Sequence, residues 1–288
     1  MKKRTLIRKI ATYIFLTIST FIMVYPILFM VLGSFATNAQ FSEIRFLPVP
    51  STLNIPLFKS AFEGVSRAYI ITSLRIIFYV TINLATALMA GYIFSKLTFP
   101  GRNRLFLMFL SGMLMPAILM LLPDFILMAR FPFAGGNNFI GQGGHGFFNE
   151  WQALFLFGWV SPFAIFLMKQ SYDMLPIEYE EAAKMDGAGL FTIIFRVYGP
   201  LLKPPMVALI IITAVGIWND YLWPSQAVIS RFDLYPIAVV LKDIYMGGAG
   251  LYPSAMVRVL MAIWPPALLF FVLQRYFVQG LLASGIKG

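Results

Sequence analysis

The chain has 288 residues, of which 59% are hydrophobic and only 12% are charged. Soluble globular domains are about 45–50% apolar and about 25% charged, so this composition indicates a membrane protein and argues against a soluble enzyme. Cysteine is absent and His145 is the single histidine, which excludes disulfide frameworks, thiolate metal sites and multi-histidine metal sites. The net charge is +10, but the basic residues punctuate apolar runs and form no solvated face, which argues against a nucleic-acid partner.

Six apolar stretches are long enough to cross a bilayer, because a spanning helix needs roughly 20 predominantly apolar residues. The sequence therefore predicts an all-α, polytopic membrane protein with six transmembrane helices. These helices approximately cover residues 10–35, 68–95, 103–128, 151–171, 205–229 and 254–278. The first follows a basic stretch, yet it is far longer than the roughly 7–15 residue core of a cleavable signal peptide, so we expect it to be retained.

The orientation follows from the Lys and Arg residues in alternate loops, because cytoplasmic loops carry the excess. One set of loops holds fourteen of these residues and the other holds seven, while Arg75 lies within a span. This asymmetry predicts that both termini are cytoplasmic. An even number of spans agrees with it.

Two outer loops are distinctive. Residues 37–67 contain Pro48, Pro50 and Pro56, which favour an extended excursion without a long helix. Residues 134–146 are rich in Gly and Asn, so this loop either contacts a partner or is a flexible connector.

The longest cytoplasmic loop, residues 172–204, has the pattern of a helix, a glycine corner and a second helix. Pro176 suits a first helical position, acidic residues follow it in the first turns, and Gly187 suits a C-terminal stop, which predicts a helix over 176–186. A second segment over 190–198 precedes a break at Gly199 and Pro200. Its apolar side chains need burial, either against the membrane helices or in the groove of a partner; they are Leu190, Phe191, Ile193, Ile194 and Phe195.

This loop resembles the cytoplasmic "EAA loop" of ABC-importer permeases, whose pattern is EAA, three residues, G, nine residues, and I-x-L-P. The matching residues are Glu181-Ala182-Ala183, then Gly187, then Val197-Tyr198-Gly199-Pro200, with Gly199 in place of the usual Leu. Three further stretches are similar to the sugar-transporting branch and to the second permease of maltose-type importers. They are Asp186-Gly187-Ala188 with Lys203-Pro204, the run from Trp218 to Pro224, and the tail from Gly280 to Gly288.

The resemblance implies a type I ABC importer permease fold, with residues 1–288 as one transmembrane permease domain and residues 172–204 as its coupling loop. It implies a sister permease in a heterodimer, two ATPase subunits, an extracytoplasmic sugar-binding protein, and a multi-pass location in a bacterial or archaeal cytoplasmic (inner) membrane. The chain has no G-x-x-x-x-G-K-[ST] phosphate loop. We therefore expect no cofactor and no catalysis in this chain, and ATP–Mg to be used by the partner ATPase.

The resemblance also implies roles for individual residues. The ATPase-coupling set is Glu181, Ala182, Ala183, Asp186, Gly187 and Pro200. In the alternative reading, Glu181 merely supports the start of its helix through the helix dipole. The binding-protein contact set lies in an outer loop that is otherwise a flexible connector, and comprises Gly247, Gly248, Gly250, Leu251 and Tyr252.

Polar residues within the spans are candidates for the substrate pathway, because such side chains are costly in lipid and usually face a bundle interior or a cavity. The candidates are Asn219, Asp220, Trp218 and Asn83. The alternative is that they bond to neighbouring helices, with Arg75 pairing with Asp220, and that the tryptophans belong to the interfacial belt.

These observations favour the permease subunit of an ATP-driven, binding-protein-dependent importer for a sugar or oligosaccharide. An importer permease for a non-sugar solute is the first alternative. A passive channel does not explain the docking loop, and an intramembrane enzyme lacks H-E-x-x-H, cysteine and a clear nucleophile–base pair.

Overall fold

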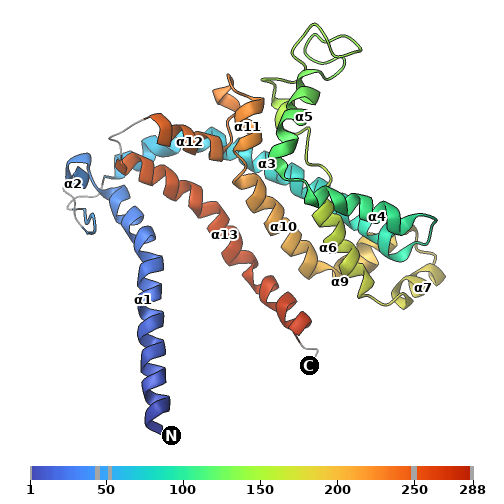
Figure 1. The fold of residues 1–288 in the computed structure, drawn as a ribbon, viewed down its shortest axis with the longest axis horizontal. Coiled ribbons are helices and arrows are strands. Elements are labelled where there is room, and N and C mark those ends of the chain that lie inside the picture. Colours follow the sequence, from blue (N-terminus) through green and yellow to red (C-terminus); the bar gives the residue numbers. More distant parts are fainter. Residues whose placement is uncertain (1, 43–45, 51–53, 248–251, 286–288) are drawn as a thin grey trace. The chain divides into compact units, whose positions relative to one another are not determined.

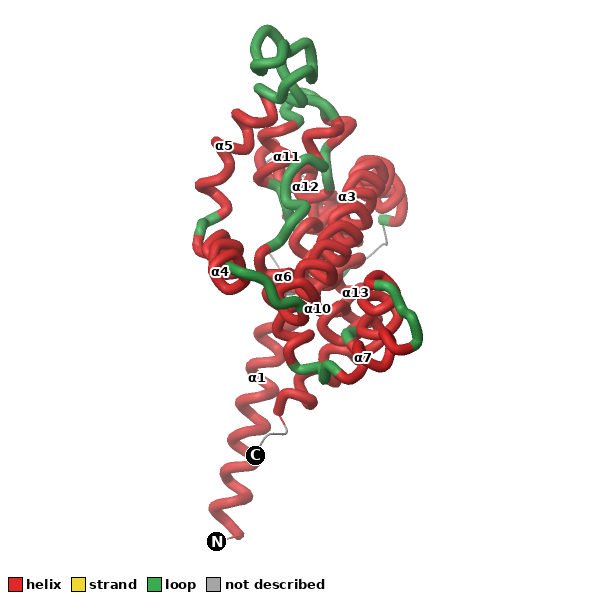
Figure 2. The backbone as a smooth tube through the Cα atoms, turned by 90° about the vertical axis from the view of Figure 1, so that its right-hand side faces the viewer, coloured by secondary structure: helices red, strands yellow, loops and turns green. Residues whose placement is uncertain are grey.

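The computed structural model describes residues 2–42, 46–50, 54–247 and 252–285 (Figure 1). In this part of the chain every regular element is a helix and no strand occurs, which confirms the predicted all-α class (Figure 2). The α-helices are α1 (Lys2–Phe35), α2 (Asn38–Ser42), α3 (Ile55–Lys96), α4 (Arg102–Ser111), α5 (Ala117–Ala129), α6 (Pro162–Asp173), α7 (Glu178–Met185), α8 (Leu190–Thr192), α9 (Gly199–Leu201), α10 (Lys203–Trp218), α11 (Leu222–Ala227), α12 (Ile237–Gly247) and α13 (Tyr252–Gly285). The short 3-10 helices are η1 (Gly112–Leu114), η2 (Trp151–Leu154) and η4 (Phe232–Leu234), and η3 (Ile193–Tyr198) is a π-helix.

Within these residues, four helical segments are long and apolar enough to cross a membrane: Arg8–Phe35, Ile55–Lys96, Lys203–Ala227 and Tyr252–Val272. A fifth consists of Arg102–Leu114 and Ala117–Ala129, which meet at an angle of 99°. Pro116 stands at this break and cannot donate a helical hydrogen bond. Five of the six predicted spans thus correspond to long helices or to this bent pair.

The predicted fourth span, 151–171, is not one continuous helix. The short turn η2 is followed by Gly158 in the left-handed region, with a φ of 85°, and the 12-residue helix α6 begins only at Pro162. Ser161 caps α6 by accepting a hydrogen bond from the Ala164 backbone N–H at 3.3 Å. Apolar composition gave no sign of this local break.

The expectation of an extended loop over 37–67 is wrong at its C-terminal end. Helix α3 begins at Ile55, well before the predicted span, with Pro56 in its first turn. A proline is accepted there because the first helical N–H groups have no intrahelical partner in any case. Pro48 and Pro50 remain outside helices, as predicted.

The chain divides into two compact units, residues 1–66 with 241–265, and residues 67–240 with 266–288. In the first unit the Tyr25 hydroxyl donates to the Phe46 carbonyl at 2.7 Å, and their rings lie 4.9 Å apart. Thr37 and Gln40 form reciprocal side-chain to backbone bonds of 3.3 and 3.0 Å, which is a capping box for α2. The prediction of one permease domain over 1–288 stays a prediction.

The second unit has its main apolar core where α3, α6, η3 and α10 meet, as Figure 1 shows for α6 and α10. Gly91 of α3 is required at this crossing, because an added Cβ would lie 2.8 Å from the Cβ of Met168. Small residues allow such close approach between membrane helices. The buried core residues are Ala87, Leu88, Tyr92, Ala164, Met168, Tyr172, Ile193, Ile194, Tyr198, Leu202 and Leu209.

The glycine-rich loop over residues 134–146 has a defined conformation, visible as the long green segment beyond α5 in Figure 2. Asn137 is buried, and its side chain donates to the carbonyls of Ala129 and Phe131 and accepts from the Gly144 N–H. This loop can therefore connect the elements on either side of it without being flexible. Its exposed tip presents apolar residues, among them Phe139 at 71% exposure.

Candidate functional site

The loop with the EAA-like pattern folds as the sequence predicts, with helix α7 inside the expected 176–186 range. Gly187 ends it in the left-handed conformation with a φ of 77°. The Gly187 N–H donates to Lys184 and the Ala188 N–H donates to Ala183, at 3.0 and 2.9 Å. This pair of bonds is a Schellman motif, which explains in physical terms why a glycine stands at this position.

The second helical segment of the loop has two faces. Ile193 and Ile194 are buried in the core of the second unit, whereas Leu190, Phe191 and Phe195 are exposed. The Phe191 and Phe195 rings are stacked, with centroids 6.4 Å apart. Burial against the membrane helices is thus confirmed for two of the apolar side chains, and docking of the other three in the groove of a partner stays a prediction.

The break predicted at Gly199 and Pro200 is only local. The π-helix η3 ends at Tyr198, but a further turn, α9, begins at Gly199 with Pro200 in its first turn, and α10 follows after Leu202. Proline is tolerated in a first turn, so the loop passes almost directly into a membrane span. Gly199 is buried, and an added Cβ would meet only the Ile194 carbonyl at 3.6 Å.

The remaining residues of the predicted coupling set lie on different sides of α7. Glu181, Ala182 and Asp186 are exposed, while Ala183 is partly buried and packs against the core. In the described part of the chain the Glu181 carboxylate has no ion-pair partner. It is therefore available to a cation outside this chain.

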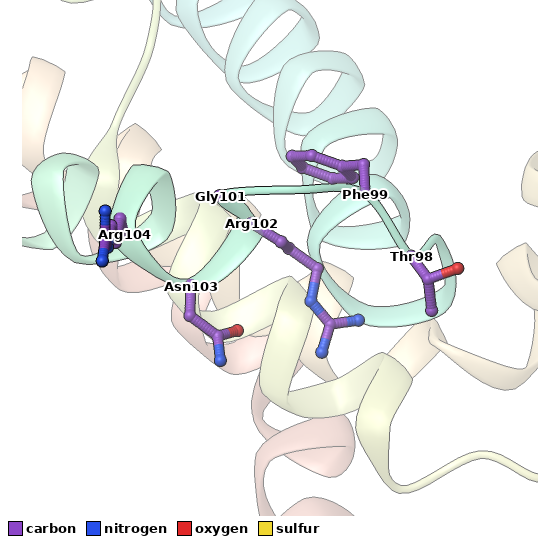
Figure 3. A pocket seen from close by; sticks show the side chains of 6 residues that line it. All are labelled: Thr98, Phe99, Gly101, Arg102, Asn103 and Arg104. Atoms are coloured by element: carbon purple, nitrogen blue, oxygen red, sulfur yellow. The ribbon is translucent and has the colours of Figure 1, made fainter.

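Two hollows border the turn that follows α3, and the first of them also borders α7. One has a volume of about 370 Å³ and is lined by Lys96, Leu97, Thr98, Phe99, Ile177, Glu180, Glu181 and Lys184. The other, of about 510 Å³, is lined by Thr98, Phe99, Gly101, Arg102, Asn103 and Arg104. Figure 3 shows Arg102 and Asn103 extending to the same side of this turn, and Arg102 Nη1 donates to the Leu97 carbonyl at 3.0 Å.

Sequence reasoning missed the buried carboxylate of this site. Glu180 is only 2% exposed and accepts a hydrogen bond of 2.7 Å from the Tyr92 hydroxyl of α3. Lys184 lies 2.7 Å from the same carboxylate, and the Tyr198 hydroxyl makes a longer contact of 3.5 Å. Burial, and then the negative charge of Glu180, raise the pKa of Tyr198 to about 12, so its hydroxyl remains protonated at neutral pH. The sequence feature that could have indicated a buried carboxylate here was the set of tyrosines that face this loop, Tyr92, Tyr172 and Tyr198.

The candidate pathway residues do not form one cluster. Asp220 pairs with the buried Arg75, whose Nη2 lies 2.6 Å from the carboxylate, as in the alternative reading of the sequence. Asn219 is exposed and donates to the Val215 carbonyl at 2.9 Å. Trp218 is buried beside Tyr69, with ring centroids 5.8 Å apart.

Asn83 is 4% exposed, and its amide donates to the carbonyls of Tyr79 and Gly158 at 3.0 and 3.1 Å. These bonds tie α3 to the segment between η2 and α6. Its buried Oδ1 has no hydrogen-bond partner among the described residues, and its role in the substrate pathway stays a prediction.

The predicted binding-protein contact is described only at its edges. Gly247 ends α12, and Tyr252 begins α13 with 56% exposure. Gly248, Gly250 and Leu251 lie outside the described residues. In the part of the chain that the structure describes, no group of three or more His, Asp or Glu residues is arranged to hold a metal ion.

Comparison with known proteins identifies the family. The sequence pattern of the family described as "Binding-protein-dependent transport system inner membrane component" matches residues 84–282, more than half of the chain. The chain belongs to this family. It is thus an inner-membrane component of a binding-protein-dependent ABC transport system, which confirms the resemblance seen in the coupling loop.

Several relatives match over nearly their full length. The arabinooligosaccharides transport system permease protein AraQ of Halalkalibacterium halodurans is 30% identical over 273 residues, covering 93% of this chain and 92% of the relative. The lactose transport system permease protein LacG of Rhizobium radiobacter is 27% identical, covering 96% and 95%.

A solved structure supports the fold. A chain from a bacterial ABC transporter involved in the import of the acidic polysaccharide alginate superposes with a TM-score of 0.79 at 24% identity, covering 94% of this chain and 96% of that one. The predicted importer-permease fold is therefore confirmed.

Proposed function

We propose that this family member is one half of the membrane channel of a sugar or oligosaccharide importer, driven by separate ATPase subunits. The observation that carries the proposal is the coupling loop. Its EAA-like residues form a capped helix that carries Glu181, which is exposed and has no ion-pair partner within the described chain, and the following segment exposes Leu190, Phe191 and Phe195. An acidic group beside an apolar patch suits a groove with a basic rim on a cytoplasmic partner.

The proposed assembly contains a sister permease, two ATPase subunits that use ATP–Mg, and an extracytoplasmic binding protein that delivers the solute. ATPase closure moves the coupling loop, and the membrane helices alternate between inward-open and outward-open states. This chain supplies no phosphate-binding loop, so hydrolysis takes place in the partner. In this assembly both termini face the cytoplasm, and the 247–252 loop meets the binding protein.

The proposed substrate class rests on the relatives named for arabinooligosaccharides and lactose, together with the maltodextrin permease MalD of Streptococcus pneumoniae, which is 29% identical over 283 residues. A non-sugar solute is the second candidate. One relative is consistent with it, the permease GgtD of Synechocystis, which is named for uptake of osmoprotective compounds and is 30% identical over 234 residues.

The test is mass spectrometry of the proteins that co-purify with this chain from gently solubilised native membranes. We expect a second permease, an ATPase and a binding protein. Ligand screening of that binding protein then distinguishes a sugar from an osmoprotectant. Recovery of this chain alone, under conditions that preserve other transporters, would contradict the proposal.

A further inference from the structure

The coupling loop is joined to membrane helix α3 by a buried polar contact. Glu180 of α7 is 2% exposed and Tyr92 of α3 is 1% exposed, and the Tyr92 hydroxyl donates to the Glu180 carboxylate at 2.7 Å. The two residues lie 88 positions apart in the sequence. A second link nearby, from Lys96 Nζ to the Leu175 carbonyl at 2.5 Å, joins the end of α3 to the turn before α7.

A buried carboxylate is costly unless it is paired and hydrogen-bonded. Glu180 obtains its positive partner from Lys184, one turn along the same helix, and this lysine is 58% exposed. Lys184 moves with α7, so the ion pair stabilises the charge but ties α7 to nothing else. The close hydrogen bond from Tyr92 is the contact that anchors the charge to a membrane span.

Three tyrosine rings enclose this contact. Tyr172 of α6 packs edge-to-face against Tyr92 and Tyr198, with centroids 5.9 and 5.3 Å away. Among the residues that the structure describes, the Tyr172 hydroxyl is buried without a hydrogen-bond partner, so this residue contributes packing only. Tyr92 thus packs and makes the close bond to Glu180, Tyr198 packs and makes the longer one, and Tyr172 only packs.

The neighbouring glutamates of α7 point in opposite directions. Glu181 is exposed, while Glu180 is directed into the core of the second unit. Helix α3 leads from Tyr92 to the buried Arg75, 17 residues away or about 25 Å along a helix, where the Arg75–Asp220 pair meets the break between α10 and α11. One continuous helix therefore connects the coupling loop to the Arg75–Asp220 pair, in which the arginine is buried.

We propose that the Glu180–Tyr92 hydrogen bond transmits movement of the coupling loop into α3, making both residues positioning residues of the transport cycle. The proposal rests on the proposed function, in which the loop docks on an ATPase. Glu181 contacts the ATPase, whereas Glu180, through its hydrogen bond to Tyr92, passes the movement of α7 to α3. Loss of the Tyr92 hydroxyl therefore leaves docking intact but removes the buried link between α7 and α3. The Lys96–Leu175 bond between α3 and the turn before α7 stays in place, so movement of α7 reaches α3 less effectively.

The experiment uses the full complex with its partners in proteoliposomes, and measures ATPase association, ATP hydrolysis and solute transported per ATP. Tyr92→Phe removes one hydroxyl and keeps the ring. Tyr172→Phe is the matched control, since it removes an unpartnered hydroxyl from the same cluster. Glu180→Gln is compared with Glu178→Gln, which changes an exposed glutamate of the same helix.

We expect Tyr92→Phe to keep wild-type ATPase association, while solute transported per ATP falls by about ten-fold, the scale of one hydrogen bond to a charged group, and the melting temperature falls slightly because the buried Glu180 carboxylate loses a donor. Glu180→Gln has the same effect, and the double variant is no worse than either single variant. Both controls retain the wild-type ratio.

An unchanged ratio in Tyr92→Phe overturns the proposal, and so does a loss of ATPase association in that variant. If Glu180→Gln fails to fold, Tyr92→Phe decides alone. Failure of the wild-type chain to bind any ATPase contradicts the proposed function instead, so the two failures are distinguishable.

Discussion

At the scale of single residues, burial decides what a charge does in this protein. Glu180 and Glu181 are adjacent and chemically identical, yet one is enclosed by tyrosines and the other is open to a partner. Arg75 is likewise buried and bonded to Asp220 and to the Leu154 carbonyl. The sequence identifies Arg75 and Asp220 as costly in a membrane, but the bonds of Arg75 are made to residues 79 and 145 positions away.

Glu181→Gln should weaken association with the ATPase, because Glu181 is the glutamate of the EAA-like pattern and its exposed carboxylate has no ion-pair partner in the described chain. We expect a several-fold lower recovery of ATPase in co-purification, about the value of one interfacial charge pair, with unchanged membrane insertion. Glu178→Gln is the control. Normal ATPase recovery and normal uptake in Glu181→Gln would rule out the docking role.

Asp220→Asn should destabilise the second unit, because it leaves the Arg75 charge buried at 1% exposure without its counter-ion. We expect a loss of about 2 kcal/mol, below the roughly 3–5 kcal/mol of fully buried pairs, since the Asp220 side chain is 25% exposed. Thermal unfolding in detergent measures it. Asp233→Asn, which breaks more exposed pairs with Arg67 and Arg231, should leave the melting temperature unchanged. Equal melting of both variants would contradict the argument.

At the scale of elements, the coupling loop is held by local turn chemistry and by the core beneath it. The Schellman motif at Gly187 fixes the corner, and Ile193 and Ile194 anchor the second segment. Both features could be predicted, because a glycine stop and an apolar run are visible in the sequence. The division of the apolar run into buried and exposed faces required the structure.

Gly187→Ala should destabilise the coupling loop by about 1 kcal/mol, because a Cβ is disfavoured in the left-handed conformation even though nothing lies within 4 Å of it. Gly189→Ala is the matched control, since this glycine has open space and a negative φ of −77°. Limited proteolysis of the loop compares the two. Equal protection of both variants would be the contrary result.

Gly91→Ala should force α3 and α6 apart, because the new Cβ would lie 2.8 Å from the Met168 Cβ and 3.0 Å from the Lys169 backbone nitrogen. We expect a loss of about 1–3 kcal/mol in detergent unfolding, typical of overpacking. Gly216→Ala in α10 has open space and should be neutral or slightly stabilising. If Gly91→Ala left the unfolding stability unchanged, the crossing of α3 and α6 would have to adjust to the new Cβ, which would contradict this prediction.

At the scale of the whole molecule, orientation can be tested directly because the chain has no cysteine of its own. A cysteine at Phe139, 71% exposed, should react with a membrane-impermeant maleimide added to intact cells. A cysteine at Met174, 82% exposed, should react only after permeabilisation. Both positions follow from the excess of Lys and Arg in the loops assigned to the cytoplasm. The reverse pattern of labelling would invert the topology.

The sequence by itself determined the all-α membrane class, most of the long apolar helices, the capped helix of the coupling loop and the family, because these depend on composition, periodicity and short motifs. Tertiary structure decided where α3 begins and where the 151–171 segment breaks. It also decided which carboxylate of α7 is buried, and that Asp220 belongs to an ion pair. The physical reason is the same in each case. These features depend on contacts between residues distant in sequence and on local breaks at Gly158, Ser161 and Pro162, to which an average of apolar character is insensitive.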